Sequence, residues 1–243
     1  GSPYAIKDSY NVNPDLADDP TRRLEEFVAL VERIHQHGMK VVMDMVPNHV
    51  ARCYHSISNP KGVEDFGVQD NTQVEYAQDN NFYYNVGESL TLPTTTVGYL
   101  PEEPALRALL LTPYKEYPAK WTGNSRSSSP ALTDWYETIK LNYGVAPDGH
   151  KDFDSLPAEV AQWDAGAHYA FWRSRVVPNT WRKFKEVVSF WLSLGVDGFR
   201  YDMAEMVPVE FWSYLNSYIK SRRPDAFLMA EIYNPDSYRD YLH

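Results

Sequence analysis

Two short segments in the second half of the chain combine apolar runs with ionisable side chains suited to nucleophilic and acid–base chemistry. In residues 198–202, Arg200 and Asp202 are two apart on an expected strand, so both side chains point to the same face. An adjacent arginine lowers the pKa of a carboxyl group and keeps it ionised, as a nucleophile requires. Glu231 directly follows the apolar run 227–230, where desolvation would raise its pKa toward that of a general acid. The two carboxylates therefore predict divided roles.

A third apolar run, at residues 39–45, also ends in polar side chains. Asp44 lies at its end, and Asn48 and His49 follow shortly after. An acid at a single strand end more often caps the next loop or helix than it catalyses. Its recurrence on three consecutive strands favours a site, because the C-terminal ends of the strands form the active-site rim of a parallel barrel.

Three helix–strand units must position these side chains. In order, they comprise a helix from Asp19-Pro20 to Gly38 with a strand at 39–45, a helix at 181–192 with a strand at 196–201, and a helix at 211–219 with a strand at 227–230. A capping residue followed by proline marks the start of the first helix. The alternation predicts a parallel sheet, either doubly wound or closed into a barrel.

A long segment separates the first unit from the second. Residues 51–178 are rich in Pro, Ser, Thr, Asn and Tyr. Loops between a strand and the next helix usually have only about two to six residues. An excursion of this length therefore predicts an inserted subdomain.

The composition excludes several classes of partner. A formal net charge of -10 argues against nucleic acid and anionic membranes, because both attract a basic face. No run approaches the roughly 20 apolar residues of a membrane span. The single cysteine, Cys53, excludes an internal disulfide and leaves the localisation open. Secretion or a periplasmic location is compatible with the sequence, although no leader is expected in this part of the chain. A neutral or small partner is expected.

Short motifs in this chain resemble, in order, those of glycoside hydrolase family 13, the α-amylase family. Residues 44–49 resemble its Asp-x-x-x-Asn-His motif at the third barrel strand, 198–202 its Gly-Phe-Arg-x-Asp at the fourth, and 230–231 its glutamate at the fifth. Residues 138–142 resemble a motif near the end of its inserted subdomain, and residues 2–8 the loop after its second strand.

The resemblance implies an α/β fold: strands three to five of a (β/α)8 TIM barrel, with a subdomain inserted after strand three. It divides the chain into a barrel part at 1–50, the inserted subdomain at 51–178 and a second barrel part at 179–243. The chain is then expected to be a part of a longer enzyme, inactive in isolation. The family's third carboxylate, in a His-Asp pair, would lie after residue 243.

By the same resemblance, Asp202 is the nucleophile that forms a covalent glycosyl-enzyme and Glu231 the acid that protonates the leaving oxygen and then activates water. Arg200 orients and ionises Asp202. The implied activity is that of a retaining α-glycosidase on α-1,4-glucans such as starch, glycogen or maltodextrin. A retaining pair implies carboxyl groups roughly 5–5.5 Å apart.

The resemblance also implies the residues around this pair. His49 and Tyr4 would contact the sugar, and Asp44 would support the rim by hydrogen bonds. Asn48 would bind calcium, for which oxygen ligands are suited; a simple loop cap by Asn48 is the alternative. No organic cofactor is implied.

One departure from the family concerns the outer sugar sites. The family carries Lys-His three and four residues after its nucleophile, whereas this chain has Glu205 and Met206 there. A transglycosylase or isomerase acting on short α-glucosides with the same two carboxylates therefore remains an alternative. A non-catalytic α-amylase-like binding domain is a further alternative, against which the intact Asp202, Arg200 and Glu231 argue.

Overall fold

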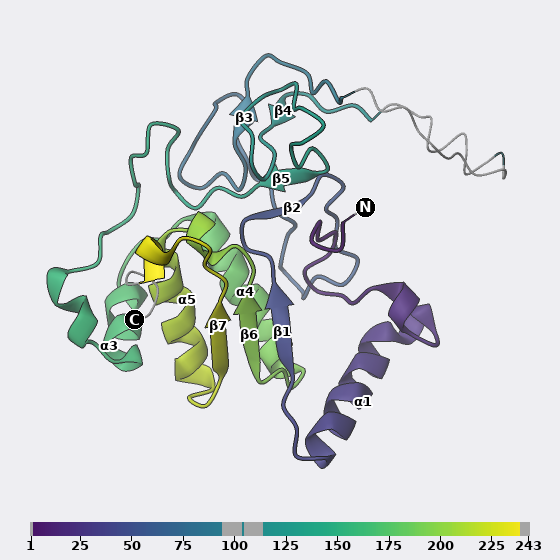
Figure 1. Ribbon diagram of the computed structural model, residues 1–243, viewed down its shortest axis with the longest axis vertical. Helices are drawn as coiled ribbons and strands as arrows, with labels where there is room; N and C mark the ends of the chain where they lie inside the picture. Colours follow the sequence, from purple (N-terminus) through teal and green to yellow (C-terminus); the bar gives the residue numbers. More distant parts are fainter. Residues whose placement is uncertain (1, 94–103, 105–113, 239–243) are drawn as a thin grey trace.

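Three short strands form one parallel sheet in the computed structural model, which describes residues 2–93, 104 and 114–238 (Figure 1). The strands are β1 (Val42–Met45), β6 (Gly198–Tyr201) and β7 (Phe227–Ala230), in the order β1-β6-β7. The register pairs Asp44 of β1 with Arg200 of β6. The predicted parallel arrangement is confirmed, and among the described residues the sheet is open and not a closed barrel.

Gly198 permits the close approach of β6 and β7. A β-carbon at this position would lie 2.0 Å from the carbonyl oxygen of Phe227. The glycine of the 198–202 motif therefore has a packing reason, because any side chain would push apart the two strands that end in Asp202 and Glu231.

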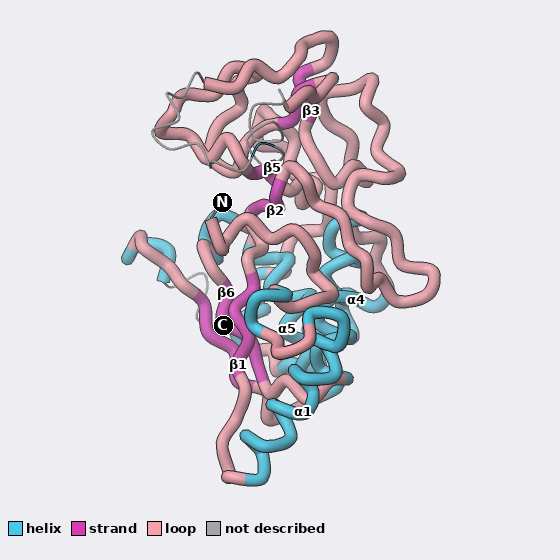
Figure 2. Tube along the Cα trace, turned by 90° about the vertical axis from the view of Figure 1, so that its right-hand side faces the viewer, coloured by secondary structure: helices cyan, strands magenta, loops and turns pink. Residues whose placement is uncertain are grey.

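Helices cover one face of the sheet. The α-helices are α1 (Arg23–Gln36), α3 (Ala165–Arg173), α4 (Asn179–Ser193) and α5 (Val209–Arg222). Figure 2 shows α4 and α5 on the same side of the strands. Between these layers lies a core of fully or almost fully buried side chains, including Trp181, Phe184, Val188, Phe199, Tyr201, Phe211 and Leu215. Residues alternate along a strand, so Arg200, between two buried aromatic residues, faces the opposite side.

The first helix begins slightly later than the sequence predicts. Asp19 accepts a hydrogen bond from the backbone N–H of Thr21, and Pro20 follows it, as expected for a helix start. This first turn is a 3-10 turn, and the α-helix itself begins at Arg23. The short 3-10 turns of the described residues are Pro14–Leu16, Pro20–Arg22, Ala158–Gln162, Ala204–Met206 and Pro235–Ser237. None of the helices in the described part is long and apolar enough to cross a membrane.

The segment between β1 and α4 builds two small antiparallel sheets. β2 (His49–Ala51) pairs with β5 (Thr138–Lys140), and β3 (Tyr84–Asn85) pairs with β4 (Ala119–Lys120). Figure 1 shows these strands beyond the C-terminal ends of β1, β6 and β7. The segment therefore lies over the edge of the sheet at which the polar side chains were predicted.

Two observations bear on the predicted division at 51–178. A buried ion pair joins Arg52 to Glu116 at 2.6 Å, within the inserted segment. Helix α3, near the end of the same range, packs against α5 instead. Residues 94–103 and 105–113 of the range, like Gly1 and residues 239–243, lie outside the described residues. The boundaries of the division stay a prediction.

Candidate active site

The C-terminal ends of the three parallel strands bring together Asp44, Arg200, Asp202 and Glu231. The backbone pairing continues one residue past β6 and β7. The N–H of Asp202 donates to the carbonyl of Met45 at 2.9 Å, and the N–H of Glu231 donates to the carbonyl of the residue before Asp202, also at 2.9 Å. The parallel register therefore fixes the two carboxylates next to each other before any side-chain contact is made.

One guanidinium group contacts all three carboxylates. Nη1 of Arg200 lies 2.9 and 3.0 Å from the two oxygens of Asp44 and 2.9 Å from Oδ1 of Asp202. Nη2 lies 2.7 Å from Oε1 of Glu231. The planar fork of arginine suits such multiple contacts. A single positive charge therefore holds three acidic groups at one edge of the sheet.

Glu231 receives two further hydrogen bonds. The backbone N–H of Met203 donates to Oε2 at 3.1 Å, and the hydroxyl of Tyr233 donates to Oε1 at 2.9 Å. Met203 has a left-handed backbone with φ of 51°, which is uncommon for a residue with a side chain and costs about 1 kcal/mol. This strained residue directly follows Asp202 and directs its N–H at Glu231. Backbone strain of this kind is concentrated at functional sites.

The pKa values of the two carboxyl groups shift in opposite directions. Burial raises the pKa of Asp202; the Arg200 guanidinium opposes this rise, and the hydrogen-bonded Glu231 carboxyl adds to it. Burial also acts to raise the pKa of Glu231, but hydrogen bonds from the Met203 N–H and the Tyr233 hydroxyl, together with Arg200, bring it below its ordinary value. Both directions are opposite to the sequence prediction, because Asp202 is the more enclosed side chain and Glu231 has more donors.

The two carboxyl groups contact each other and must titrate together. The two side chains interact, which raises the pKa of Asp202 and lowers that of Glu231. One guanidinium binds both groups, through Nη1 to Asp202 and through Nη2 to Glu231. The roughly 5–5.5 Å separation of a retaining pair stays a prediction.

The structure places the ring of His49 next to the backbone of Tyr4. Burial lowers the pKa of His49 to about 4, with Lys140 adding to the effect and the Tyr4 backbone opposing it. His49 is therefore a neutral imidazole at pH 7. Its ring lies 5.4 Å from that of Trp135, and the Tyr4 side chain is exposed. Among the described residues, no hydrogen bond joins either of them to the three carboxylates. Their contact with sugar stays a prediction.

Asn48 is fully buried, and both polar atoms of its side-chain amide make hydrogen bonds. Its Nδ2 donates to the carbonyl of Gly123 at 2.9 Å, and its Oδ1 accepts a hydrogen bond from the ammonium of Lys140. The oxygen that a calcium ion would take thus faces a cation. Within the described ranges no group of three or more His, Cys, Asp or Glu side chains is arranged to hold a metal. Asn48 does not fit as a calcium ligand in this arrangement; calcium at any other place stays a prediction.

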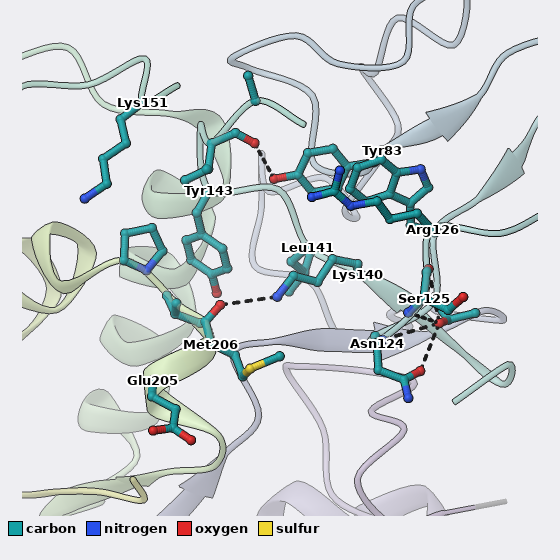
Figure 3. A pocket seen from close by; sticks show the side chains of 17 residues that line it. Tyr83, Asn124, Ser125, Arg126, Lys140, Leu141, Tyr143, Lys151, Glu205 and Met206 are labelled. Atoms are coloured by element: carbon teal, nitrogen blue, oxygen red, sulfur yellow. Dashed lines mark hydrogen bonds between the residues drawn. The ribbon is translucent and has the colours of Figure 1, made fainter. Parts of the chain in front are cut away.

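A pocket of about 440 Å³ lies between the inserted segment and the loop that follows Asp202. Figure 3 shows Tyr83, Arg126 and Lys140 on one side and Glu205 and Met206 on the other. Its inner wall is aromatic: Trp121 stacks on Tyr83 at 4.4 Å, and the guanidinium of Arg126 lies 4.6 Å from the Trp121 ring. Flat rings next to polar groups suit the faces of sugars. The pocket therefore extends the candidate site on the side of this loop.

Comparison with known proteins decides the family. Residues 2–96 match the family model of the alpha amylase catalytic domain. Over 235 residues, the chain is 38% identical to neopullulanase 2 of Thermoactinomyces vulgaris, covering 96% of this chain and 27% of that protein. Over 242 residues it is 21% identical to alpha-amylase 3 of Dictyoglomus thermophilum, covering 95% of this chain and 33% of that protein. The chain belongs to the α-amylase family.

The fold of this α-amylase-family chain agrees with a solved structure. It superimposes on the maltogenic amylase from S. marinus with a TM-score of 0.52 at 20% identity, over 98% of this chain and 27% of that one. The chain thus spans about a third, or less, of the length of these relatives. The likeness shows the fold of the parallel strands.

Sequence reasoning missed three residues of this α-amylase-family site. Tyr233 lies two residues after Glu231, a spacing that could have indicated a contact with the same carboxylate. Lys140 lies inside the 138–142 motif. A positive charge in a motif close to an expected cation site was the feature by which the sequence could have indicated it. Met203 had no signal, because nothing in the residue type predicts a left-handed backbone.

Proposed function

We propose that the protein is a retaining α-glycosidase that acts on α-1,4-linked glucans such as starch, glycogen or maltodextrin. The observation that carries the proposal is the single Arg200 guanidinium bound to Asp44, Asp202 and Glu231 at the C-terminal edge of parallel strands. That edge is the catalytic face of parallel barrels. The amylase and neopullulanase names of the relatives support the same class.

In the proposed reaction, a carboxylate oxygen of Asp202 attacks the anomeric carbon of the sugar. The bond from this carbon to the glycosidic oxygen breaks, and Glu231 donates its proton to that oxygen. Glu231, now ionised, takes a proton from a water molecule, whose oxygen attacks the same carbon. The bond to Asp202 then breaks, which restores both carboxyl groups and keeps the anomeric configuration.

The cycle requires one carboxyl group ionised and the other protonated. The reaction needs Asp202 ionised and Glu231 protonated, whereas in the free protein the pKa of Asp202 is raised and that of Glu231 is lowered. Arg200 contacts both groups and stabilises the negative charge that remains. When a sugar separates the carboxyl groups, Asp202 loses the contact with Glu231 that raises its pKa. Substrate binding thereby favours the charge state that the reaction requires.

Covalent trapping tests the proposal directly. A 5-fluoro-α-glycosyl fluoride has a good leaving group and forms a glycosyl-enzyme that breaks down slowly. We expect the mass of the full protein to rise by one glycosyl unit, with the label on the peptide that contains Asp202. The product of ordinary turnover should have the α configuration when followed by NMR.

The Asp202→Asn variant serves as the control for this experiment and should take up no label. A label on Glu231, or a product of inverted configuration, would contradict the assigned roles. If neither label nor turnover occurs on any α-glucan, the non-catalytic binding domain becomes the better account. Transfer of the glycosyl unit to an added sugar instead of water would indicate the transglycosylase, for which the aromatic pocket beside Glu205 offers an acceptor site.

Tyr233 provides a prediction about pH. Its hydroxyl donates to Glu231 and lowers the pKa of that carboxyl group. The Tyr233→Phe variant should therefore raise the pKa of Glu231, and the acid stays protonated to higher pH. We expect the alkaline limb of kcat/KM to move to higher pH, since this limb reports the essential acid of the free enzyme.

The exposed Tyr238 offers a matched control for this variant. Tyr238→Phe should leave the pH profile of kcat/KM unchanged. An alkaline limb of Tyr233→Phe that stays in place, or moves to lower pH, would show that Glu231 is not the group whose protonation limits activity there.

A further inference from the structure

The side chain of Lys140, the last residue of β5, lies between two parts of the chain that are distant in sequence. Its ammonium donates to Oδ1 of Asn48, which is fully buried, and to the carbonyl oxygen of Met206 at 3.3 Å. Figure 3 shows the contact with Met206 across the pocket. Met206 ends the 3-10 turn that follows Asp202, so Lys140 connects the inserted segment to the loop of the proposed nucleophile.

The two acceptors are oriented toward one point. Asn48 cannot turn its oxygen elsewhere without losing the hydrogen bond from its Nδ2 to the carbonyl of Gly123. The backbone holds Lys140 equally firmly, since its N–H donates to the carbonyl of Trp121 at 3.0 Å and its residue pairs with His49 in the β2–β5 sheet. The amide oxygen of Asn48 and the carbonyl oxygen of Met206 therefore both favour a positively charged group at this point.

The two acceptors are neutral oxygens, and together they form a site that favours a cation. An amide oxygen and a backbone carbonyl are ligands that a hard metal ion such as calcium accepts. Here a lysine ammonium meets them, and a second cation next to it would be repelled.

We propose that the Lys140 ammonium takes the place of a metal ion and fastens the inserted segment to the loop that carries Asp202. In this role Lys140 is a positioning residue. It holds Met206, and through the short turn 204–206 it fixes the left-handed Met203 whose N–H contacts Glu231. The connection needs no bound calcium at Asn48.

A substitution that makes the protein depend on a metal ion tests this proposal in the full protein. Lys140→Asp would add a carboxylate to the two oxygens and remove the ammonium, which leaves a set of ligands suited to calcium. We expect this variant to bind one calcium ion more than the wild type in equilibrium dialysis. Its thermal midpoint should be low in EDTA and rise by about 3–6 °C more than that of the wild type when calcium is added.

Two further variants make the result unambiguous. Lys140→Met, without charge or oxygen, should have a thermal midpoint about 3–6 °C below the wild type, equally in EDTA and in calcium. Lys61→Met, which changes an exposed lysine of the same segment, should match the wild type. If Lys140→Asp does not fold in EDTA, the neutral Lys140→Asn provides a second oxygen-bearing variant for the same comparison.

The proposal fails if Lys140→Asp and the wild type bind the same number of calcium ions and respond equally to calcium. It also fails if Lys140→Met keeps the thermal midpoint of the wild type, because the ammonium would then not fasten the two parts of the chain. Neither result depends on catalysis, so the test is independent of the proposed glycosidase activity.

Discussion

Replacing Asp202 with asparagine should lower kcat by about 10⁵-fold while the dissociation constant for maltodextrin changes by less than about tenfold. An amide cannot form the ester bond to the anomeric carbon, yet it has almost the same shape as the carboxylate. Burial raises the pKa of Asp202, so its ionised form is unfavourable in the folded protein as pH rises above that pKa. The neutral asparagine should therefore leave the thermal midpoint at pH 7 equal to or above that of the wild type.

The chain offers a matched control at the opposite end of the sheet. Asp225 lies in the turn before β7 and has a side chain that is 72% exposed, so Asp225→Asn should change neither kcat nor the thermal midpoint. Reducing-sugar release gives kcat, and calorimetry gives the dissociation constant. Near-native turnover in Asp202→Asn would remove Asp202 from the role of nucleophile and leave the motif assignment without support.

Replacing Arg200 with methionine should lower both activity and stability. The three carboxylates would then face one another without their shared cation, and about 3 kcal/mol of stability should be lost at pH 7. Arg200 lowers the pKa of Asp202 and of Glu231, so without the cation both pKa values rise above those of the unfolded chain. The folded state then binds more protons than the unfolded state, so stability is regained as pH falls. We expect the gap in thermal midpoint between the two proteins to be larger at pH 7 than at pH 4.5.

The same change should affect the pH profile of catalysis. A nucleophile with a raised pKa is ionised only at higher pH, so the acid limb of kcat/KM should move upward in Arg200→Met. Arg200→Lys keeps the charge but not the planar fork, and it should restore most of the stability and less of the activity. If the difference in thermal midpoint between Arg200→Met and the wild type does not change with pH, Arg200 does not stabilise these carboxylates by its charge.

The sequence indicated the strands and the residues at their ends because both depend on local patterns. Continuous apolar runs at 39–45, 196–201 and 227–230 indicate strands, and the helical stripes between them indicate parallel connections. The expected burial of these strands is wrong for β7 and for most of β1, because they form the edges of an open sheet. The period of two along a strand places Arg200 and Asp202 on one face, as the structure shows. The short motifs identified the family, and the family model and the relatives confirm it.

The sequence did not indicate how the charges of the site are distributed. It predicted that Arg200 lowers the pKa of Asp202 and that apolar neighbours raise the pKa of Glu231. In the structure the directions are reversed, because Arg200 is divided among three carboxylates and Glu231 receives the N–H of Met203 and the hydroxyl of Tyr233. A pKa depends on all groups within a few ångströms, and most of these are remote in sequence.

By itself, then, the sequence determined the order of the helices and strands, the edge at which Asp44, Asp202 and Glu231 meet, and the family. Only the tertiary structure decided which groups share the Arg200 cation and which cation faces Asn48. Lys140 and Asn48 are 92 positions apart, and their contact exists because β2 and β5 pair in one register. Local patterns specify elements through propensity and periodicity, whereas contacts between remote side chains follow from how those elements pack.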